Sequence, residues 1–129
     1  MILVDTSVWI DHLRSGDAAL ARLLEAQRVL GHRFILGELA LGALRARATV
    51  LRDLAHLPQV ETARDEEVMH LIEKERLYGR GIGYIDAHLL ASLRLTPGSA
   101  LWTRDARLHR VASDMKLAAA QPRQCKTVR

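Results

Sequence analysis

Short apolar runs alternate along this chain with amphipathic segments, and this alternation constrains the fold more than any other feature. The first run, Ile2-Leu3-Val4, ends directly at Asp5, and a later run, Ala100-Leu101-Trp102, is followed closely by Asp105. Runs of this kind predict buried strands, whereas the segments between them have helical spacing. Because parallel strands need crossover connections, the sequence predicts an α/β fold. We expect a three-layer α/β/α sandwich around a short-stranded, mainly parallel sheet.

Capping residues and apolar spacing place the expected elements. Helices are predicted after Asp5-Thr6-Ser7, from Asp17, over 34–44, over 46–57, from Asp65, over 84–95 and from Asp105. Further strands are predicted near 28–30, near Val60 and near 117–119. Residues 78–83 contain Gly79, Gly81 and Gly83 and predict a loop.

The length and the cysteine content indicate one globular domain in a reducing compartment. The chain has 129 residues, and its single cysteine, Cys125, cannot form an internal disulfide. We expect one domain over residues 1–120, a basic and flexible tail over 121–129, and a cytoplasmic location. We expect neither a membrane helix nor a secretory signal, because the apolar stretch 34–44 is too short and the first residues lack a basic lead-in.

The charge balance favours no single partner. The net charge is +4, from 19 basic and 15 acidic residues, and most of the basic residues are arginine. Guanidinium groups bind phosphate well, so a nucleic-acid partner fits this composition. The arginines are scattered, however, and codon bias in a GC-rich genome explains them equally well.

Two acids follow predicted strands and therefore share one expected location. Asp5 and Asp105 come after strands whose carboxyl ends should lie at the same edge of the sheet, where open α/β sheets bind ligands. Each residue alone is also explained as a helix N-cap.

Two further acids lie on predicted helices. Glu38 is surrounded in sequence by apolar residues, so we expect it to be buried, and a buried unpaired carboxylate costs several kcal/mol. It therefore needs a cation or a hydrogen-bond network; a salt bridge to Arg45 or Arg47 is the alternative. Asp86 is expected in the first turn of its helix, where the helix dipole alone could explain it.

Together the four acids, Asp5, Glu38, Asp86 and Asp105, predict a site for Mg²⁺ or Mn²⁺. Such cations take oxygen ligands from a few carboxylates, with water and phosphate in the remaining positions. Thr6, Ser7 and Thr103 stand beside two of these acids and are expected to orient carboxylates or bound waters, although each is equally ordinary as a cap. Without a metal, the clustered charges should raise one another's pKa values.

Other patterns carry less chemistry. The glycines of the 78–83 loop, with Arg80, lack the spacing of a dinucleotide site and the lysine of a P-loop, and indicate a flexible loop near the cleft. The histidines show no H-x-x-x-H pair. Trp9 and Trp102 stand in apolar contexts and are expected in the core.

Four motifs resemble one known family in the same order along the chain. They are Asp5-Thr6-Ser7-Val8-Trp9-Ile10-Asp11, Gly37-Glu38-Leu39, Tyr84-Ile85-Asp86-Ala87-His88-Leu89-Leu90-Ala91 and Leu101-Trp102-Thr103-Arg104-Asp105. Over residues 1 to about 120 the chain is similar to the PIN-domain ribonucleases, in particular to the VapC toxins of prokaryotic type II toxin–antitoxin pairs. The resemblance implies a PIN-like sandwich, Mg²⁺- or Mn²⁺-dependent cleavage of RNA, a homodimer and inhibition by a VapB-type antitoxin.

The resemblance also implies residue roles. Asp5, Glu38, Asp86 and Asp105 correspond to the family's acidic quartet, and Thr103 corresponds to its hydroxyl residue before the last acid. Leu108 stands where an aromatic residue is common, and no further acid follows closely, so a second tightly held metal is not implied.

The expected reaction is metal-assisted hydrolysis of RNA. One ion would be held mainly by Asp5, Asp86 and Asp105, while Glu38 would hold the ion's waters or accept a proton. Cleavage would leave a 5′-phosphate and a 3′-hydroxyl. Outside the quartet, 19 basic residues face 11 acidic ones, and Arg80 and Arg104 are candidates for RNA binding.

Two alternatives belong to other functional classes. A phosphoacceptor receiver domain is also α/β and binds Mg²⁺, but it needs a second acid beside Asp5, where this chain has Thr6. A catalytically silent PIN-like module that binds RNA or an antitoxin would keep the same fold.

Overall fold

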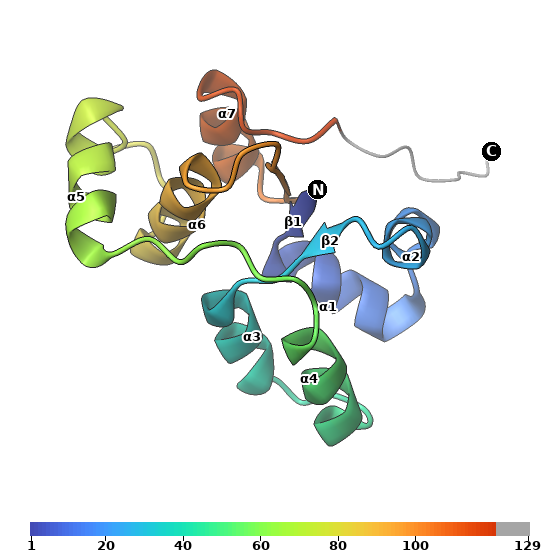
Figure 1. The fold of residues 1–129 in the computed structure, drawn as a ribbon. Coiled ribbons are helices and arrows are strands. Elements are labelled where there is room, and N and C mark those ends of the chain that lie inside the picture. The colour runs from blue at the N-terminus through green and yellow to red at the C-terminus, as the bar shows by residue number, and fades with distance from the viewer. Residues whose placement is uncertain (121–129) are drawn as a thin grey trace.

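Residues 1–120 are described by the computed structural model, and they place a small sheet between two groups of helices (Figure 1). The strands are β1 (Ile2–Val4), β2 (Val29–Leu30) and β3 (Ala100–Trp102). All three pair in parallel, in the order β2-β1-β3. The predicted fold class, a three-layer α/β/α sandwich with a short parallel sheet, is confirmed.

Two of the predicted strands are wrong. The segment near Val60 forms a single bridge, between Gln59 and Gly31, and the segment 117–119 forms another, between Ala118 and Leu101. After Val60 the chain runs beside the C-terminal half of α6 and does not extend the sheet. The Glu61 amide donates to Thr96 Oγ1, and the Ala63 amide donates to Ser92 Oγ.

Seven helices surround the sheet in the described part of the chain. They are α1 (Thr6–Ser15), α2 (Ala18–Glu25), α3 (Arg33–Ala40), α4 (Arg47–Ala55), α5 (Asp65–Lys74), α6 (Tyr84–Arg94) and α7 (Ala106–Asp114). In Figure 1, α1 to α4 lie on one side of β1 and α5 to α7 on the other. The predicted helix starts are confirmed where a side chain caps the helix: Asp17 accepts a hydrogen bond from the Leu20 amide, at 2.9 Å.

The helix predicted over 34–44 is shorter than expected and is not apolar on all faces. It ends at Ala40, and Leu41 beyond it is 90% exposed. Ile35 and Leu39 are buried, whereas Glu38 is exposed. The reason is tertiary: α3 packs against α1 and α4 at the edge of the molecule, so only one of its faces meets the core (Figure 1).

The core surrounds α6, in which every residue from Ala87 to Leu93 is buried. β1 and β3 supply further buried side chains, and Trp9 and Trp102 are buried, as predicted. Burial of each large apolar side chain contributes about 1.5–3 kcal/mol. Asp5 and Asp105 follow these buried strands, and Asp86 stands one residue before the buried part of α6, so the core positions all three acids.

No helix among the described residues is long and apolar enough to cross a bilayer. The predicted flexible tail, 121–129, lies outside the described residues.

Candidate functional site

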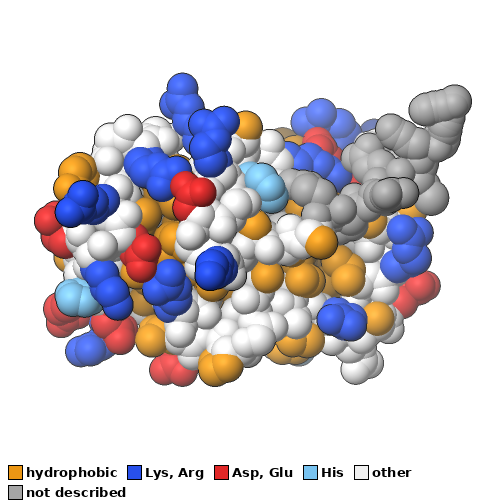
Figure 2. Space-filling view, turned by 90° about the horizontal axis from the view of Figure 1, so that it is seen from above, with side chains coloured by type: hydrophobic (Ala, Val, Ile, Leu, Met, Phe, Trp, Pro, Cys, Tyr) orange, Lys and Arg blue, Asp and Glu red, His pale blue; other side chains and the backbone are white. Residues whose placement is uncertain are grey.

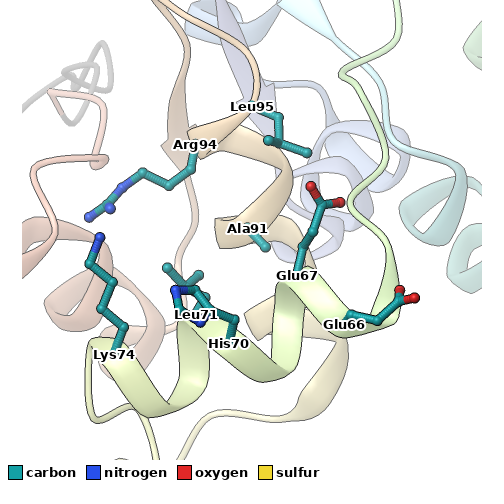
Figure 3. A pocket seen from close by; sticks show the side chains of 8 residues that line it. All are labelled: Glu66, Glu67, His70, Leu71, Lys74, Ala91, Arg94 and Leu95. Carbon is teal, nitrogen blue, oxygen red and sulfur yellow. The ribbon is translucent and has the colours of Figure 1, made fainter.

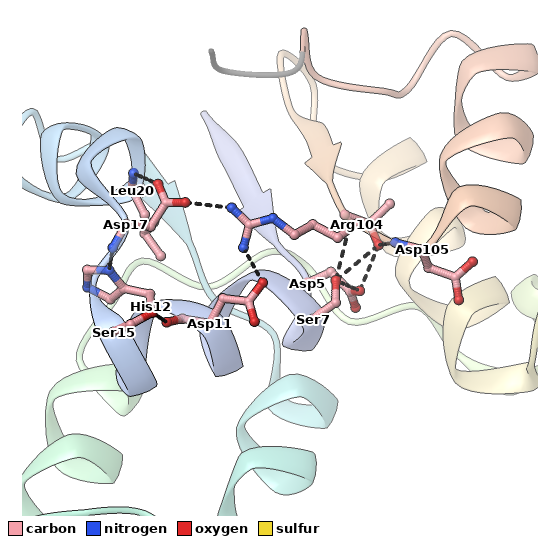
Figure 4. Close-up of polar contacts among 10 residues, drawn as sticks. Asp5, Ser7, Asp11, His12, Ser15, Asp17, Leu20, Arg104 and Asp105 are labelled. Carbon is pink, nitrogen blue, oxygen red and sulfur yellow. Dashed lines mark hydrogen bonds and ion pairs between the residues drawn. The ribbon is translucent and has the colours of Figure 1, made fainter. Parts of the chain in front are cut away.

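Asp5 follows β1 and lies at the centre of a hydrogen-bond network. Its carboxylate is nearly buried, and its Oδ2 accepts hydrogen bonds from Ser7 Oγ and Thr103 Oγ1, both at 2.8 Å. Ser7 Oγ in turn accepts a hydrogen bond from the Arg104 amide, at 3.0 Å (Figure 4). The Asp5 side chain does not cap α1. The capping explanation is therefore wrong for Asp5, and both hydroxyl groups orient its carboxylate.

Asp105 lies at the same edge of the sheet because β3 pairs with β1. Val4 is opposite Trp102, and the Asp5 amide donates to the Trp102 carbonyl. Asp105 does cap α7: its Oδ1 accepts from the amides of Arg107 and Leu108, at 2.9 and 3.1 Å. Its own amide donates to Thr103 Oγ1, at 3.1 Å. One hydroxyl group thus contacts both acidic segments.

Glu38 and Asp86 reach the same region from helices. Thr6 Oγ1 donates to Glu38 Oε1, at 2.6 Å, and so joins α3 to the residue next to Asp5. Asp86 Oδ2 accepts from the Gly83 amide at the start of α6, at 3.0 Å. The expectation that Glu38 is buried is wrong, and neither Arg45 nor Arg47 pairs with it within the described residues; Arg47 donates to the Ala40 carbonyl instead.

The four carboxylates share one arrangement. In each, one oxygen accepts one or two hydrogen bonds from the protein, and the structure shows no protein donor for the other oxygen among the described residues. Each group is therefore held in orientation and keeps an oxygen for a further ligand.

Electrostatics show that the four carboxylates interact. Burial raises the pKa of Asp86, and the hydrogen bond from the Gly83 amide partly opposes that effect. The negative charges of Asp5, Asp105 and Glu38 raise this pKa further. Residues 5, 38, 86 and 105 are distant in sequence, yet they lie close enough for three of them to act on the fourth.

The donor set fits a hard divalent cation. Within residues 1–120, no three histidine, cysteine, aspartate or glutamate side chains are arranged to hold one ion by themselves. Mg²⁺ usually keeps several waters and binds proteins through one or two carboxylates together with substrate phosphate. Four oriented carboxylates, without histidine or cysteine, match that preference and not the preference of zinc.

Both arginines proposed for RNA binding form ion pairs. Arg104 contacts Asp11 Oδ2 at 2.8 Å and Asp17 Oδ2 at 2.5 Å (Figure 4). Its guanidinium lies 5.6 Å from the Trp102 ring centroid. Arg80 pairs with Asp114, at 2.7 Å.

The roles of Asp11 and Asp17 as anchors for Arg104 were missed by sequence reasoning. Burial by itself raises the pKa of Asp17, but the hydrogen bonds from the Leu20 amide and from Arg104 lower it below its usual value. No local pattern joins residue 104 to residues 11 and 17, because the contact depends on how α1 and α2 meet the turn after β3.

A separate hollow of about 340 Å³ contains none of the four acids (Figure 3). It opens between α5 and α6, with Leu71, Ala91 and Leu95 as apolar lining and Lys74 and Arg94 among its charged residues. The acidic site is therefore distinct from this hollow.

The fold and the acidic edge of the sheet define a class of protein. A model of the PIN domain family matches residues 2–114, and the chain belongs to that family. Because the chain is a PIN domain, the alternative of a phosphoacceptor receiver domain is excluded. Over 121 residues the chain is 46% identical to Ribonuclease VapC32 from two strains of Mycobacterium tuberculosis, and the match covers 94% of this chain and 98% of the relative. PIN-domain ribonucleases generally depend on a divalent metal.

Proposed function

We propose that this chain is a metal-dependent endoribonuclease and the toxin of a type II toxin–antitoxin pair, inhibited by a VapB-type antitoxin. The supporting observation is the set of four oriented, mutually repelling carboxylates at one sheet edge of a PIN domain. The 46% identity to a protein named as a VapC ribonuclease points to the same activity.

The proposed metal is Mg²⁺, with Mn²⁺ able to replace it, and Asp5, Asp86 and Asp105 would hold it together with water and substrate phosphate. When bound, the ion supplies a Lewis acid that activates water and neutralises phosphate charge. Glu38, which is exposed, would hold a water molecule or accept its proton. Ser7 and Thr103 fix the orientation of Asp5, and Thr6 fixes that of Glu38.

The proposed reaction is hydrolysis of a phosphodiester bond. Water adds to phosphorus in line with the leaving 3′-oxygen, the bond from phosphorus to that oxygen breaks, and the oxygen takes up a proton. The products are a 5′-phosphate and a 3′-hydroxyl.

RNA must approach a negative site, which requires positive charge elsewhere. Outside the quartet the chain has 19 basic and 11 acidic residues, and this positive balance supports binding along the RNA backbone. Figure 2 shows the face on which the N-terminus of β1 lies, where Lys and Arg side chains are mixed with Asp and Glu. We propose a cytoplasmic homodimer; sedimentation analysis of the purified chain tests the dimer.

The test is cleavage of RNA by the purified chain with Mg²⁺ or Mn²⁺ and with EDTA. We expect metal-dependent cuts whose ends carry a 5′-phosphate and a 3′-hydroxyl, and no cuts by the Asp5→Asn variant. Induced expression in a growing host should arrest growth with the natural chain and not with Asp5→Asn. Equal arrest by both chains, or equal cleavage in EDTA, would contradict the proposal.

A further inference from the structure

The exposed side chain of Arg107 lies across Gly81, in the loop that leads into α6. A Cβ atom at Gly81 would stand 2.7 Å from Arg107 Cδ and 2.9 Å from its Nη1. The guanidinium therefore occupies the space that a side chain at residue 81 would need. Gly81 has a φ of +83°, which also favours glycine. The positive φ therefore selects glycine at this position, and a side chain there would displace the guanidinium.

This contact joins the two segments that present Asp86 and Asp105. Arg107 is two residues after Asp105, in the first turn of α7. Gly81 is two residues before Gly83, whose amide holds Asp86. The Arg107 guanidinium consequently lies at the edge of the acidic site, between two of its carboxylate-bearing segments.

Arg107 differs from the other arginines near the acidic site. Arg80 and Arg104 are ion-paired, whereas Arg107 forms no ion pair with any carboxylate of residues 1–120. Its guanidinium packs against the Gly81 backbone, and within residues 1–120 its N–H groups donate to no protein acceptor, so they are available to a ligand. A planar guanidinium matches two oxygens of a phosphate group.

We propose that Arg107 binds a backbone phosphate of the RNA strand at the edge of the acidic site, with Gly81 as the surface that holds the guanidinium in place. The proposal rests on the proposed ribonuclease function and assigns to Arg107 the role considered above for Arg80 and Arg104. A cation at this edge offsets the repulsion between the four carboxylates and the RNA backbone.

The test measures binding of a single-stranded RNA oligonucleotide to the full chain by fluorescence anisotropy, in EDTA to prevent cleavage, over a series of salt concentrations. One phosphate contact contributes a slope of about 0.7 to the dependence of log Kd on log salt for single strands. We expect Arg107→Ala to weaken binding about 5- to 20-fold at low salt and to lower the slope by about 0.7. Arg107→Lys should keep the slope.

Arg22→Ala is the matched control, because Arg22 is an exposed arginine on α2, which carries none of the four acids. It removes the same charge and should leave the slope unchanged. In cleavage assays with metal, Arg107→Ala should raise KM more than it lowers kcat.

Gly81→Ala tests the supporting surface. It should displace the guanidinium and reduce the slope as Arg107→Ala does, and the double variant should bind RNA no more weakly than Arg107→Ala. If Gly81→Ala does not fold, the two Arg107 variants decide the matter alone.

A natural chain that neither binds nor cuts RNA overturns the proposed function and this inference together. A chain that cuts RNA while Arg107→Ala keeps its Kd and slope overturns only the inference.

Discussion

The hydroxyl group of Thr103 is buried and joins two acids from opposite ends of the chain. It donates to Asp5 Oδ2 and accepts from the Asp105 amide, at 2.8 and 3.1 Å. A hydroxyl group can do both, which a methyl group of the same size cannot.

Thr103→Val should therefore reduce RNA cleavage about 10- to 100-fold, the usual cost of losing a group that orients a metal-binding carboxylate. Thr103→Ser keeps the hydroxyl and should retain most of the activity. Cleavage rates at saturating Mn²⁺, with melting temperatures to verify folding, provide the measurement. Equal activity of the two variants would show that the hydroxyl does not position Asp5.

Asp86 carries an electrostatic cost in the metal-free protein. Its pKa is raised in the folded state, so its ionised form is less favourable there than in the unfolded chain. Asp86→Asn removes the charge and keeps an oxygen for the Gly83 amide; it should raise the melting temperature in EDTA by a few degrees. Asp53→Asn, an exposed acid on α4, should leave it unchanged.

Addition of Mn²⁺ should reverse that order. At a concentration about 100 times its Kd, a ligand stabilises the native state by about 2.7 kcal/mol. Wild type and Asp53→Asn should gain this stability, and Asp86→Asn should gain little. A lower melting temperature for Asp86→Asn in EDTA, with undiminished Mn²⁺ stabilisation, would indicate that Asp86 serves only as a cap.

At the scale of elements, Asp105 both caps α7 and presents a carboxylate to the acidic site. Asparagine caps helices about as well as aspartate, whereas alanine costs about 1 kcal/mol. Asp105→Asn and Asp105→Ala should both abolish cleavage. The free energy of unfolding of the alanine variant should be about 1 kcal/mol lower than that of the asparagine variant. Urea unfolding of both in EDTA measures the difference; cleavage by Asp105→Asn would contradict the metal-binding role.

The start of α3 is tied to α6 through the buried His32. Its Nδ1 accepts from the Phe34 amide, so its Nε2 carries the proton and donates to Ser92 Oγ, at 3.0 Å. Burial, followed by the positive charges of His88 and Arg33, lowers the pKa of His32 from 6.5 to about 4. A second proton on Nδ1 would also face the Phe34 N–H group.

Stability should therefore fall as the pH is lowered from 6.5 to about 4, because the unfolded chain takes up a proton at His32 over that range and the folded chain does not. The loss attributable to His32 is about 3 kcal/mol at most. His32→Asn keeps an acceptor for the Phe34 amide and should flatten the profile between these pH values in urea unfolding. The exposed Asp65, whose pKa is lowered by its hydrogen bond to His88, loses its contribution only below pH 3.8. Parallel profiles for wild type and His32→Asn would contradict this explanation.

For the whole molecule, charge is divided between a negative site and a positive remainder. Outside the quartet the chain has 19 basic and 11 acidic residues. Binding of single-stranded RNA in EDTA should weaken steadily with salt, and Asp5→Asn should bind more tightly than wild type because it removes one repelling charge. Salt-independent binding would show that backbone phosphates are not the main contacts.

Much of this architecture follows from interactions between near neighbours in the chain. The caps at Asp17 and Asp105 lie within three residues of the amides they bind, so local residue types predict both helix starts. Asp5 and Asp105 share one edge because parallel strands end together, which the alternation of strands and helices already requires.

Other features depend on the packing of segments that are far apart in sequence. Three such features could not be predicted from neighbouring residues. They are the exposure of Glu38, the ion pairs of Arg104 with Asp11 and Asp17, and the contact of Arg107 with Gly81. Their partners lie tens of residues away, and the relative positions of the helices result from many small contacts summed over the core. Periodicity and capping act over a single helical turn, so they predict where helices form and not which side chains meet between them.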